Sequence, residues 1–192
     1  MDDNKRPYNR KPRSSWLVIL TIAFAVVAVT GAGTAWWALQ IKEHTDHALK
    51  KLFFDFCVVQ YQVYKSKDDQ AKADKLCKDV WDASLASNIS PFLFTKVVAV
   101  ESAFQCDAVS YAGAFGCAQV LARTWKEKYP DMYSQRGNLF AGAAILRQYL
   151  DLFGEEKLAL TAYNRGPSMV WAILRGGGNP NENGYAQKVY DV

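Results

Sequence analysis

The strongest hydrophobic signal in the chain lies near its beginning. No charged side chain occurs from Ser14 to Ile41, and tryptophans stand close to both ends of this stretch. Such a length of uncharged, mostly apolar sequence is typical of a membrane-spanning helix with tryptophan at the two interfaces. Residues 1–13 carry five basic and two acidic side chains, which by the positive-inside rule keeps the N-terminus in the cytoplasm. We therefore expect a basic cytoplasmic tail over 1–13, a transmembrane signal-anchor helix over 14–41, and export of everything from Lys42 onward.

A cleaved secretory signal is the alternative interpretation of the same stretch. Small residues at Gly31, Gly33 and Ala35 follow the apolar run and are compatible with cleavage. The hydrophobic character continues through Trp37 and Leu39, however, which favours a retained anchor. The direction of export is the same in both cases.

Helical periodicity continues after the apolar stretch. Apolar side chains recur at helical spacing after Lys42, charged residues at 65–69 interrupt the pattern, and a second helical stretch reaches about Leu85. The sequence predicts a juxtamembrane helical hairpin over residues 42–87.

The remaining residues, 88–192, also carry mainly helical patterns. Ser90 is placed to cap a helix whose first position is Pro91, where the missing N–H costs nothing. A glycine-punctuated loop follows, and then a strongly amphipathic helix after Asn138 that Gly154 ends. One further helix and a short final helix complete the pattern, with no convincing alternation of period two. The predicted fold class is mainly α.

Charge and cysteine content narrow the classes of function. The formal net charge is +4, of which residues 1–13 account for +3, so the exported part has no basic excess that would suit nucleic acid. Cys57, Cys77, Cys106 and Cys117 all follow the apolar stretch, where an oxidising compartment favours disulfides. Sequence order suggests the pairs 57–77 and 106–117, although three connectivities and reduced cysteines remain open. No cysteine pair has the C-x-x-C spacing of a redox or zinc site, and His44 and His47 could share one metal-binding face but have no third ligand nearby, so we expect neither a metal nor a cofactor.

Glu101 stands where the helical pattern requires an apolar side chain. Phe94, Val97 and Val98 precede it on one helical stripe, and Phe104 follows on the same stripe. Burial disfavours the ionised form, so this carboxyl group should hold a proton at neutral pH and be able to donate it. That property is required of a general acid, and a structural ion pair is the alternative.

The segment from Glu101 to Gln119, ESAFQCDAVSYAGAFGCAQ, resembles the signature of the soluble lytic transglycosylase family. Members of that family share a lysozyme-like fold and cleave the glycan strands of peptidoglycan. Three later blocks are also similar to the family: Asn138, Ala141 and Gly142; Ala162, Tyr163, Asn164, Gly166 and Pro167; Tyr185 and Val189. The resemblance implies that residues 88–192 form a helical catalytic domain related to goose-type lysozyme.

The resemblance also implies a mechanism with one catalytic carboxyl group. Glu101 would protonate the glycosidic oxygen and then act as the base, whereas most glycosidases use two carboxylates. The substrate's own N-acetyl group would support the oxocarbenium-like centre, and its C6 hydroxyl would then attack that centre, leaving a 1,6-anhydroMurNAc end. Asp107 is interpreted as a surface or loop acid.

Several further residues are implied as substrate contacts: Gln119, Tyr163, Asn164, Tyr185, Ser102 and Ser110. Tyr163 is expected to hydrogen-bond the catalytic carboxyl group, Gln119 to contact an acetamido sugar, and Tyr185 to line the cleft. The two serines are weaker candidates, because small hydroxyls beside turns often cap backbone groups. The chain departs from the family at Cys117 and Ala118, where the family has Leu-Met, which predicts an altered cleft wall.

Together these features predict a membrane-anchored peptidoglycan lytic transglycosylase. We expect a single-pass protein of the bacterial inner membrane with a periplasmic catalytic domain, or a virion-associated one if phage-encoded. Its expected partners are peptidoglycan strands, the membrane, and a secretion or conjugation complex or phage particle, with no nucleic acid. A goose-type hydrolase and a non-catalytic glycan-binding scaffold are the alternative functions.

Overall fold

The computed structural model describes residues 31–65 and 69–192, with side chains from Ala35 onward. The chain divides into two units, one ending at Leu49 and one running from Lys50 to Val192. Of the first unit, the described residues 31–49 are helical throughout.

The predicted membrane span falls mostly outside this description. Residues 14–30 are not described, and residues 31–41 form the beginning of the first described helix. Within 31–65 and 69–192, no helix is both long and apolar enough to cross a membrane.

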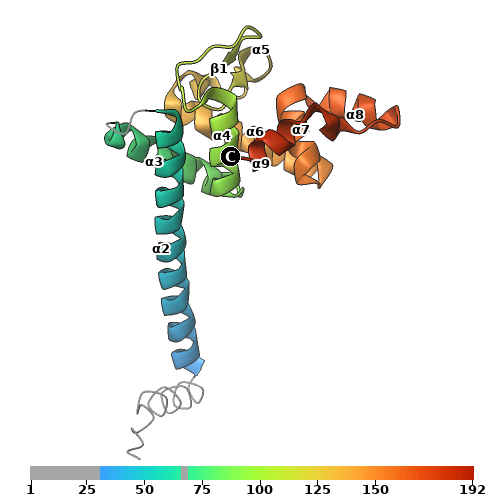
Figure 1. The fold of residues 1–192 in the computed structure, drawn as a ribbon. Helices are drawn as coiled ribbons and strands as arrows, with labels where there is room; N and C mark the ends of the chain where they lie inside the picture. Colours follow the sequence, from blue (N-terminus) through green and yellow to red (C-terminus); the bar gives the residue numbers. More distant parts are fainter. Residues whose placement is uncertain (1–30, 66–68) are drawn as a thin grey trace, which may run out of the picture. The chain divides into compact units, whose positions relative to one another are not determined.

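The described part of the chain is mainly helical, as the sequence predicts (Figure 1). Its elements are α2 (Gly31–Tyr64), α3 (Gln70–Ala86), α4 (Pro91–Ser102), β1 (Ala114–Phe115), β2 (Val120–Leu121), α5 (Ala122–Trp125), η1 (Pro130–Tyr133), α6 (Gln135–Phe153), α7 (Glu156–Arg165), α8 (Pro167–Arg175), η2 (Pro180–Asn183) and α9 (Tyr185–Tyr190). The two short strands form an antiparallel pair, with Ala114 opposite Leu121 and Phe115 opposite Val120.

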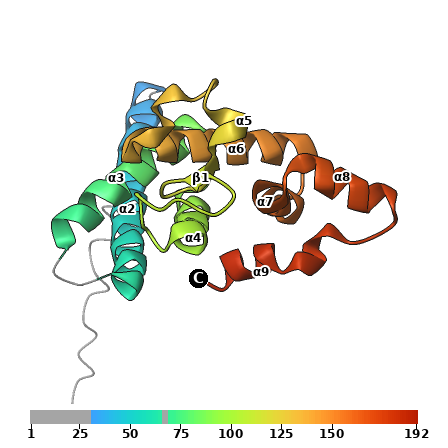
Figure 2. The same ribbon diagram turned by 90° about the horizontal axis from the view of Figure 1, so that it is seen from above.

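Helix α6 is the centre of the second unit. It packs against α3, α7 and η1, and its Leu139 and Leu146 side chains are fully buried. Helix α7 lies between α6 and α9, and contributes the buried Leu160 (Figure 2). Because α4, α7 and α9 all pack around this core, the residues at their ends can be held in fixed positions.

The two arms of the predicted hairpin, α2 and α3, are present and joined by a disulfide between Cys57 and Cys77. The Phe53 ring lies 5.0 Å from that of Trp81 on α3 and 5.6 Å from that of Phe92 on α4. The second disulfide joins Cys106 to Cys117. Both pairings suggested by sequence order are therefore confirmed.

The boundary expected between residues 87 and 88 does not divide the compact units. Helix α3 packs on α4 and α6, and its buried Asp79 accepts a hydrogen bond from the Arg136 guanidinium at 2.8 Å. Gln135 donates to the same carboxylate at 2.9 Å. A buried carboxylate with two donors is stable only while both elements stay together, so α3 belongs with the helices that follow it.

Helix ends agree with the sequence in most places. The Ser90 hydroxyl accepts the Leu93 N–H at 3.3 Å with Pro91 in the first turn, and Gly154 ends α6 in the left-handed conformation, both as predicted. Gly166 and Pro167 end α7, but they also begin α8, which the sequence analysis did not predict. Proline is favourable at a first helical position, so the residue that stops one helix starts the next.

Candidate active site

Helix α4 carries Glu101 into the site at its last turn. Upstream, Phe94, Val97 and Val98 are fully buried and fix the helix in the core. Immediately after the helix, Ala103 and Phe104 adopt left-handed conformations with φ of 50° and 60°. Non-glycine residues rarely adopt this conformation, and such strain is characteristic of functional sites. The helix therefore ends one residue beyond the carboxyl group it presents.

Burial shifts the ionisation of this carboxyl group toward neutrality. Desolvation raises the pKa of Glu101 from 4.5 to about 7, and a hydrogen bond from Tyr185 partly opposes the shift. The Tyr185 hydroxyl donates to Glu101 Oε1 at 2.5 Å. At neutral pH, protonated and ionised forms are both populated, which suits a group that gives a proton and later takes one back. The predicted rise in pKa is confirmed.

The prediction that Tyr163 hydrogen-bonds Glu101 is wrong. The Tyr163 hydroxyl instead donates to the backbone oxygen of Ala118 at 2.7 Å, and Tyr185 makes the bond to the carboxyl group. Burial and the nearby Glu101 raise the pKa of both tyrosines well above the usual value, so both remain donors. Tyr185 is buried behind Glu101 and does not line the cleft described below.

A buried asparagine fastens the loop that follows Glu101. Asn138 is fully buried on α6; its Oδ1 accepts the Ala118 N–H at 2.8 Å, and its Nδ2 donates to the backbone oxygens of Phe115 and Met132. A Cβ at Gly116 would lie 2.5 Å from the Asn138 amide carbon, so only glycine fits there. The sequence analysis used Asn138 as a helix marker and as part of the family resemblance but gave it no role, although a polar residue at the start of an apolar helix was the signal for this role.

Gln119 is held with its amide toward the loop. Its backbone has φ of 46°, and its Nε2 donates to the backbone oxygens of Gly116 at 2.9 Å and Ala108 at 3.3 Å. In the part of the chain that the structure describes, no protein donor reaches its Oε1. That oxygen is available to accept an N–H from a substrate acetamido group.

The two predicted serine contacts take different roles. Ser102 does not line the cleft; its hydroxyl donates to the backbone oxygens of Val98 and Cys117, so it ties α4 to the loop instead of meeting a sugar. Ser110 does line the cleft, and its Oγ accepts the Ala114 N–H at 3.0 Å. The sequence analysis predicted an altered cleft wall at Cys117 and Ala118. This prediction is wrong, because both residues are fully buried and neither lines the cleft.

A cleft of about 520 Å³ opens beside Glu101. The residues that define this Glu101 cleft are Glu101, Ser110, Ala112, Ala114, Gln119, Val120, Leu121, Arg123, Thr124, Trp125, Ile145, Tyr149, Tyr163, Asn164, Arg165, Gly166 and Pro167. Four predicted contacts, Ser110, Gln119, Tyr163 and Asn164, are therefore brought together with the carboxyl group. Glu101 is the only acidic side chain among the lining residues, and Arg123 and Arg165 are the only basic ones.

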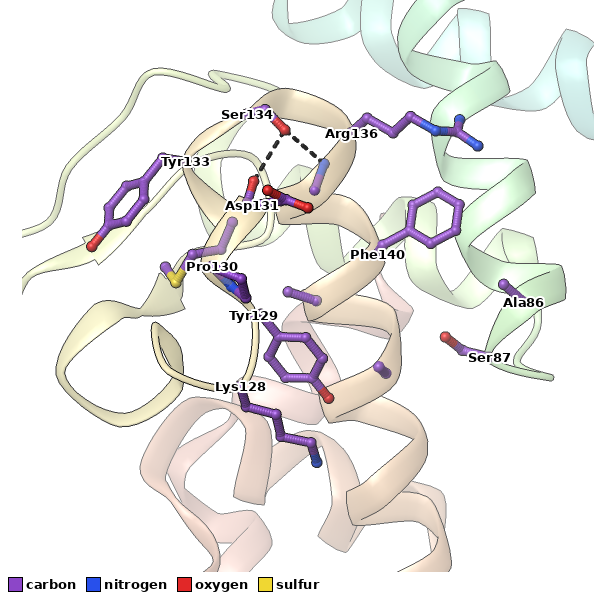
Figure 3. A pocket seen from close by; sticks show the side chains of 14 residues that line it. Ala86, Ser87, Lys128, Tyr129, Pro130, Asp131, Tyr133, Ser134, Arg136 and Phe140 are labelled. Atoms are coloured by element: carbon purple, nitrogen blue, oxygen red, sulfur yellow. Dashed lines mark hydrogen bonds between the residues drawn. The ribbon is translucent and has the colours of Figure 1, made fainter.

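A larger cavity of about 900 Å³ shares no lining residue with the Glu101 cleft (Figure 3). The residues that line this second cavity are Ala86, Ser87, Lys128, Tyr129, Pro130, Asp131, Met132, Tyr133, Ser134, Arg136, Gly137, Phe140, Ala141 and Ala144. Its Arg136 is paired with Asp79 and Asp82, and the Arg136 guanidinium lies 4.6 Å from the centre of the Phe140 ring. The pocket's acidic lining residue, Asp131, is exposed. A half-buried acid with a raised pKa, which could donate a proton, is found in the smaller cleft, and we take that cleft as the active site. Across residues 31–65 and 69–192, no three metal-binding side chains gather closely enough to hold a metal ion.

Comparison with known proteins agrees with this site. The family described as Transglycosylase SLT domain matches residues 80–185, which include the whole cleft. A transglycosylase of Enterobacteria phage PRD1 is 36% identical over 89 residues, which is 46% of this chain and 34% of the phage protein. The chain thus spans about a third of that relative.

A solved structure shows the same fold. It is an inactive mutant of the lytic transglycosylase Slt from Pseudomonas aeruginosa, with a TM-score of 0.50 and 24% sequence identity. The likeness covers 58% of this chain and 22% of that one. The predicted lysozyme-like helical fold is confirmed by this similarity together with the family match.

Proposed function

The chain belongs to the transglycosylase SLT domain family, and we propose that it is a peptidoglycan lytic transglycosylase that cleaves the MurNAc–GlcNAc β-1,4 bond. The observation that carries the proposal is the setting of Glu101. It is the only acid among the described residues that line the cleft, and burial raises its pKa to about 7. A single carboxyl group with this pKa can act first as an acid and then as a base near neutral pH.

The proposed reaction needs no second carboxylate and no water. Glu101 gives its proton to the glycosidic oxygen while the bond from that oxygen to C1 of MurNAc breaks. The Glu101 carboxylate then takes the proton of the C6 hydroxyl of the same sugar as the C6 oxygen bonds to C1. Glu101 is protonated again, one fragment ends in 1,6-anhydroMurNAc, and the other gains a hydroxyl. Among the described residues that line the cleft there is no second acid, which supports this route over a two-carboxylate mechanism.

The cleft supplies groups that can position such a substrate. Gln119 Oε1 can accept an acetamido N–H. Asn164 lines the same cleft, and its side-chain amide can either donate or accept a hydrogen bond. Trp125 and Tyr149 add aromatic surface to the walls. Tyr185 holds the Glu101 carboxyl group from behind, which leaves its second oxygen for the glycosidic bond.

The direct test compares wild type with Glu101→Gln on purified sacculi. The amide keeps the size of the side chain but has no proton to donate, so we expect cleavage to fall by about 100-fold or more. Asp107→Asn is the matched control, because Asp107 is an exposed acid close in sequence that does not line the cleft. Mass spectrometry should find anhydro ends, which are lighter than hydrolytic ends by one water.

Each other outcome indicates a different function. Reducing ends would indicate a goose-type hydrolase. Binding of sacculi without any cleavage by the wild-type protein would indicate a glycan-binding scaffold. Full activity of Glu101→Gln would remove the basis of the proposal.

We also propose that the enzyme is tethered to the inner membrane with its catalytic unit in the periplasm. The uncharged stretch of residues 14–41 and the basic excess of residues 1–13 support this topology. The two disulfides support an oxidising compartment for the chain beyond Lys50. Protease added to spheroplasts should digest the unit beyond Lys50 and leave the tag of an N-terminally tagged chain protected inside. Recovery of the full chain in the soluble fraction would contradict the tether.

A tethered enzyme of this kind suits local opening of the cell wall. We propose that it clears a passage for a secretion or conjugation complex or, as the similarity to a phage PRD1 protein suggests, for a phage particle. Restriction to the membrane would limit damage to the wall elsewhere. Co-purification with an envelope-spanning complex or a virion tests this role, and an active enzyme that associates with neither would count against it.

A further inference from the structure

The Glu101 cleft contains two arginines that have no partner among the residues that the structure describes. Arg123 lies on α5, Arg165 is the last residue of α7, and both line the same cavity as Glu101. Within residues 31–65 and 69–192, neither guanidinium group makes a hydrogen bond, an ion pair or a ring contact. Both side chains are exposed, so neither is required for packing.

Two other arginines of the same unit are paired with carboxylates. Arg136 pairs with Asp79 and Asp82, and Arg147 pairs with Asp151. Arg175, exposed at the end of α8 outside the cleft, likewise has no partner within residues 31–65 and 69–192, so Arg123 and Arg165 are distinguished by their place on the walls of the Glu101 cleft. Arg123 and Arg165 are more than 40 positions apart in the sequence, yet they converge on one cavity.

The charge of the cleft follows from these residues. Glu101 is the only acid along its walls, and with a pKa of about 7 it is only partly ionised at neutral pH. The cleft therefore carries net positive charge. Arginine presents a planar fork of donors that matches a carboxylate, and groups of this kind are enriched where carboxylates or phosphates are recognised.

The sugar rings of a glycan strand are uncharged and do not explain two unpaired cations. Anionic groups on such a strand are carried by the muramoyl residues, either as carboxylates of the stem peptide or, once the peptide is removed, as the lactyl carboxylate. We propose that Arg123 and Arg165 bind these muramoyl carboxylates and so make the enzyme selective for strands that carry them. This inference rests on the proposed function and names which strands the same cleft prefers.

The test measures initial rates on three substrates at subsaturating concentration. They are native sacculi, the same sacculi after their carboxylates have been converted to amides with carbodiimide and ammonia and washed, and strands stripped of peptides by an amidase. We expect wild type to cleave native sacculi at least about fivefold faster than amidated sacculi, since charge-assisted hydrogen bonds are lost on amidation.

Variants assign this preference to the two arginines. In Arg123→Gln/Arg165→Gln the ratio of native to amidated rates should fall to about 1, through a lower rate on native sacculi only. Arg165→Lys should give an intermediate ratio, because a lysine keeps the charge but not the fork. Arg175→Gln is the matched control: Arg175 is exposed at the end of α8 and does not line the cleft, so its ratio should equal that of wild type.

The stripped strands identify the source of the carboxylate. If their cleavage also depends on the two arginines, the lactyl carboxylate is bound; if only native sacculi show the dependence, the stem peptide is bound. An unchanged ratio in the double variant would overturn the inference while leaving the lytic activity in place. Absence of cleavage of every substrate by wild type would instead refute the proposed function itself.

Discussion

At the scale of single residues, the account depends on the energetic state of one carboxyl group. A pKa raised from 4.5 to about 7 means that ionising Glu101 in the folded protein costs about 3 kcal/mol more than in water. Desolvation causes this cost, and the Tyr185 hydroxyl offsets part of it by donating to the ionised form. The same two influences set the pH range in which Glu101 can act as an acid.

The first prediction concerns Tyr185→Phe. Removing the hydroxyl removes the interaction that lowers the pKa of Glu101, so the pKa should rise above 7. A general acid must be protonated to act, and activity is lost as pH rises through its pKa. The alkaline limb of the pH–rate profile should therefore move to higher pH. Measurement of initial rates on sacculi across pH 5 to 9 tests this.

Tyr190→Phe is the control for this variant. Tyr190 lies on the same helix, α9, but its hydroxyl bonds Glu156, which does not line the Glu101 cleft. Its profile should match that of wild type. An alkaline limb that stays in place in Tyr185→Phe would mean that Tyr185 does not influence the carboxyl group as the geometry indicates.

At the scale of elements, the loop after α4 is held by connections that cross between elements. The Cys106–Cys117 disulfide closes the loop, and Asn138 on α6 bonds it at Phe115, which ends β1, and at Ala118 in the turn before β2. Helix α6 also approaches closely, because a Cβ at Gly142 would lie 2.5 Å from Ala118 Cβ and 2.9 Å from the Tyr163 hydroxyl. The wall of the cleft is thus built on the rigid centre of the unit.

The second prediction is that Asn138→Ala destabilises the protein by about 3 kcal/mol, since it removes buried bonds to the Ala118 N–H and the Met132 oxygen and a part-buried bond to the Phe115 oxygen. Urea unfolding followed by circular dichroism measures the change. Gln148→Ala on the same helix removes only an exposed bond to Lys128 and should cost less than about 0.5 kcal/mol. Equal stability of the two variants would contradict the role assigned to Asn138.

The sequence predicts the elements well where local signals decide them. The cap at Ser90, the end of α6 at Gly154 and the buried stripe below Glu101 all depend on residues a few positions apart, and each is confirmed. The strands were not predicted, because they are only two residues long and too short for an alternating pattern. Helix α8 was not predicted, because it follows α7 after the single residue Gly166, which is typical of a helix end.

Contacts between distant segments are where prediction from sequence fails. The sequence indicates that Tyr163 and Tyr185 are both near the carboxyl group, but their roles depend on how α7 and α9 pack around α6. Only the folded structure shows that the Tyr163 hydroxyl bonds the Ala118 oxygen and that the Tyr185 hydroxyl bonds Glu101. The arginines of the cleft were missed for the same reason, because neither stands out within its own segment.

At the scale of the whole molecule, the family match at residues 80–185 is extended by earlier helices. Helix α2 and most of α3 precede it, and the Cys57–Cys77 disulfide joins these two helices. The Asp79–Arg136 ion pair then fixes α3 to α6. A segment leading from the proposed membrane anchor is in this way bonded to the core that carries Glu101, which suits the proposed tether.

The central claim, that one carboxyl group drives cleavage without water, is tested most directly by digesting purified sacculi in water enriched in heavy oxygen. Transglycosylation forms the new C1–O bond from the sugar's own C6 oxygen, so the account predicts anhydro-ended products that carry no label, and none of them with Glu101→Gln. Products that gain one labelled oxygen at C1 for each bond cut would show that water attacks, and would contradict the account.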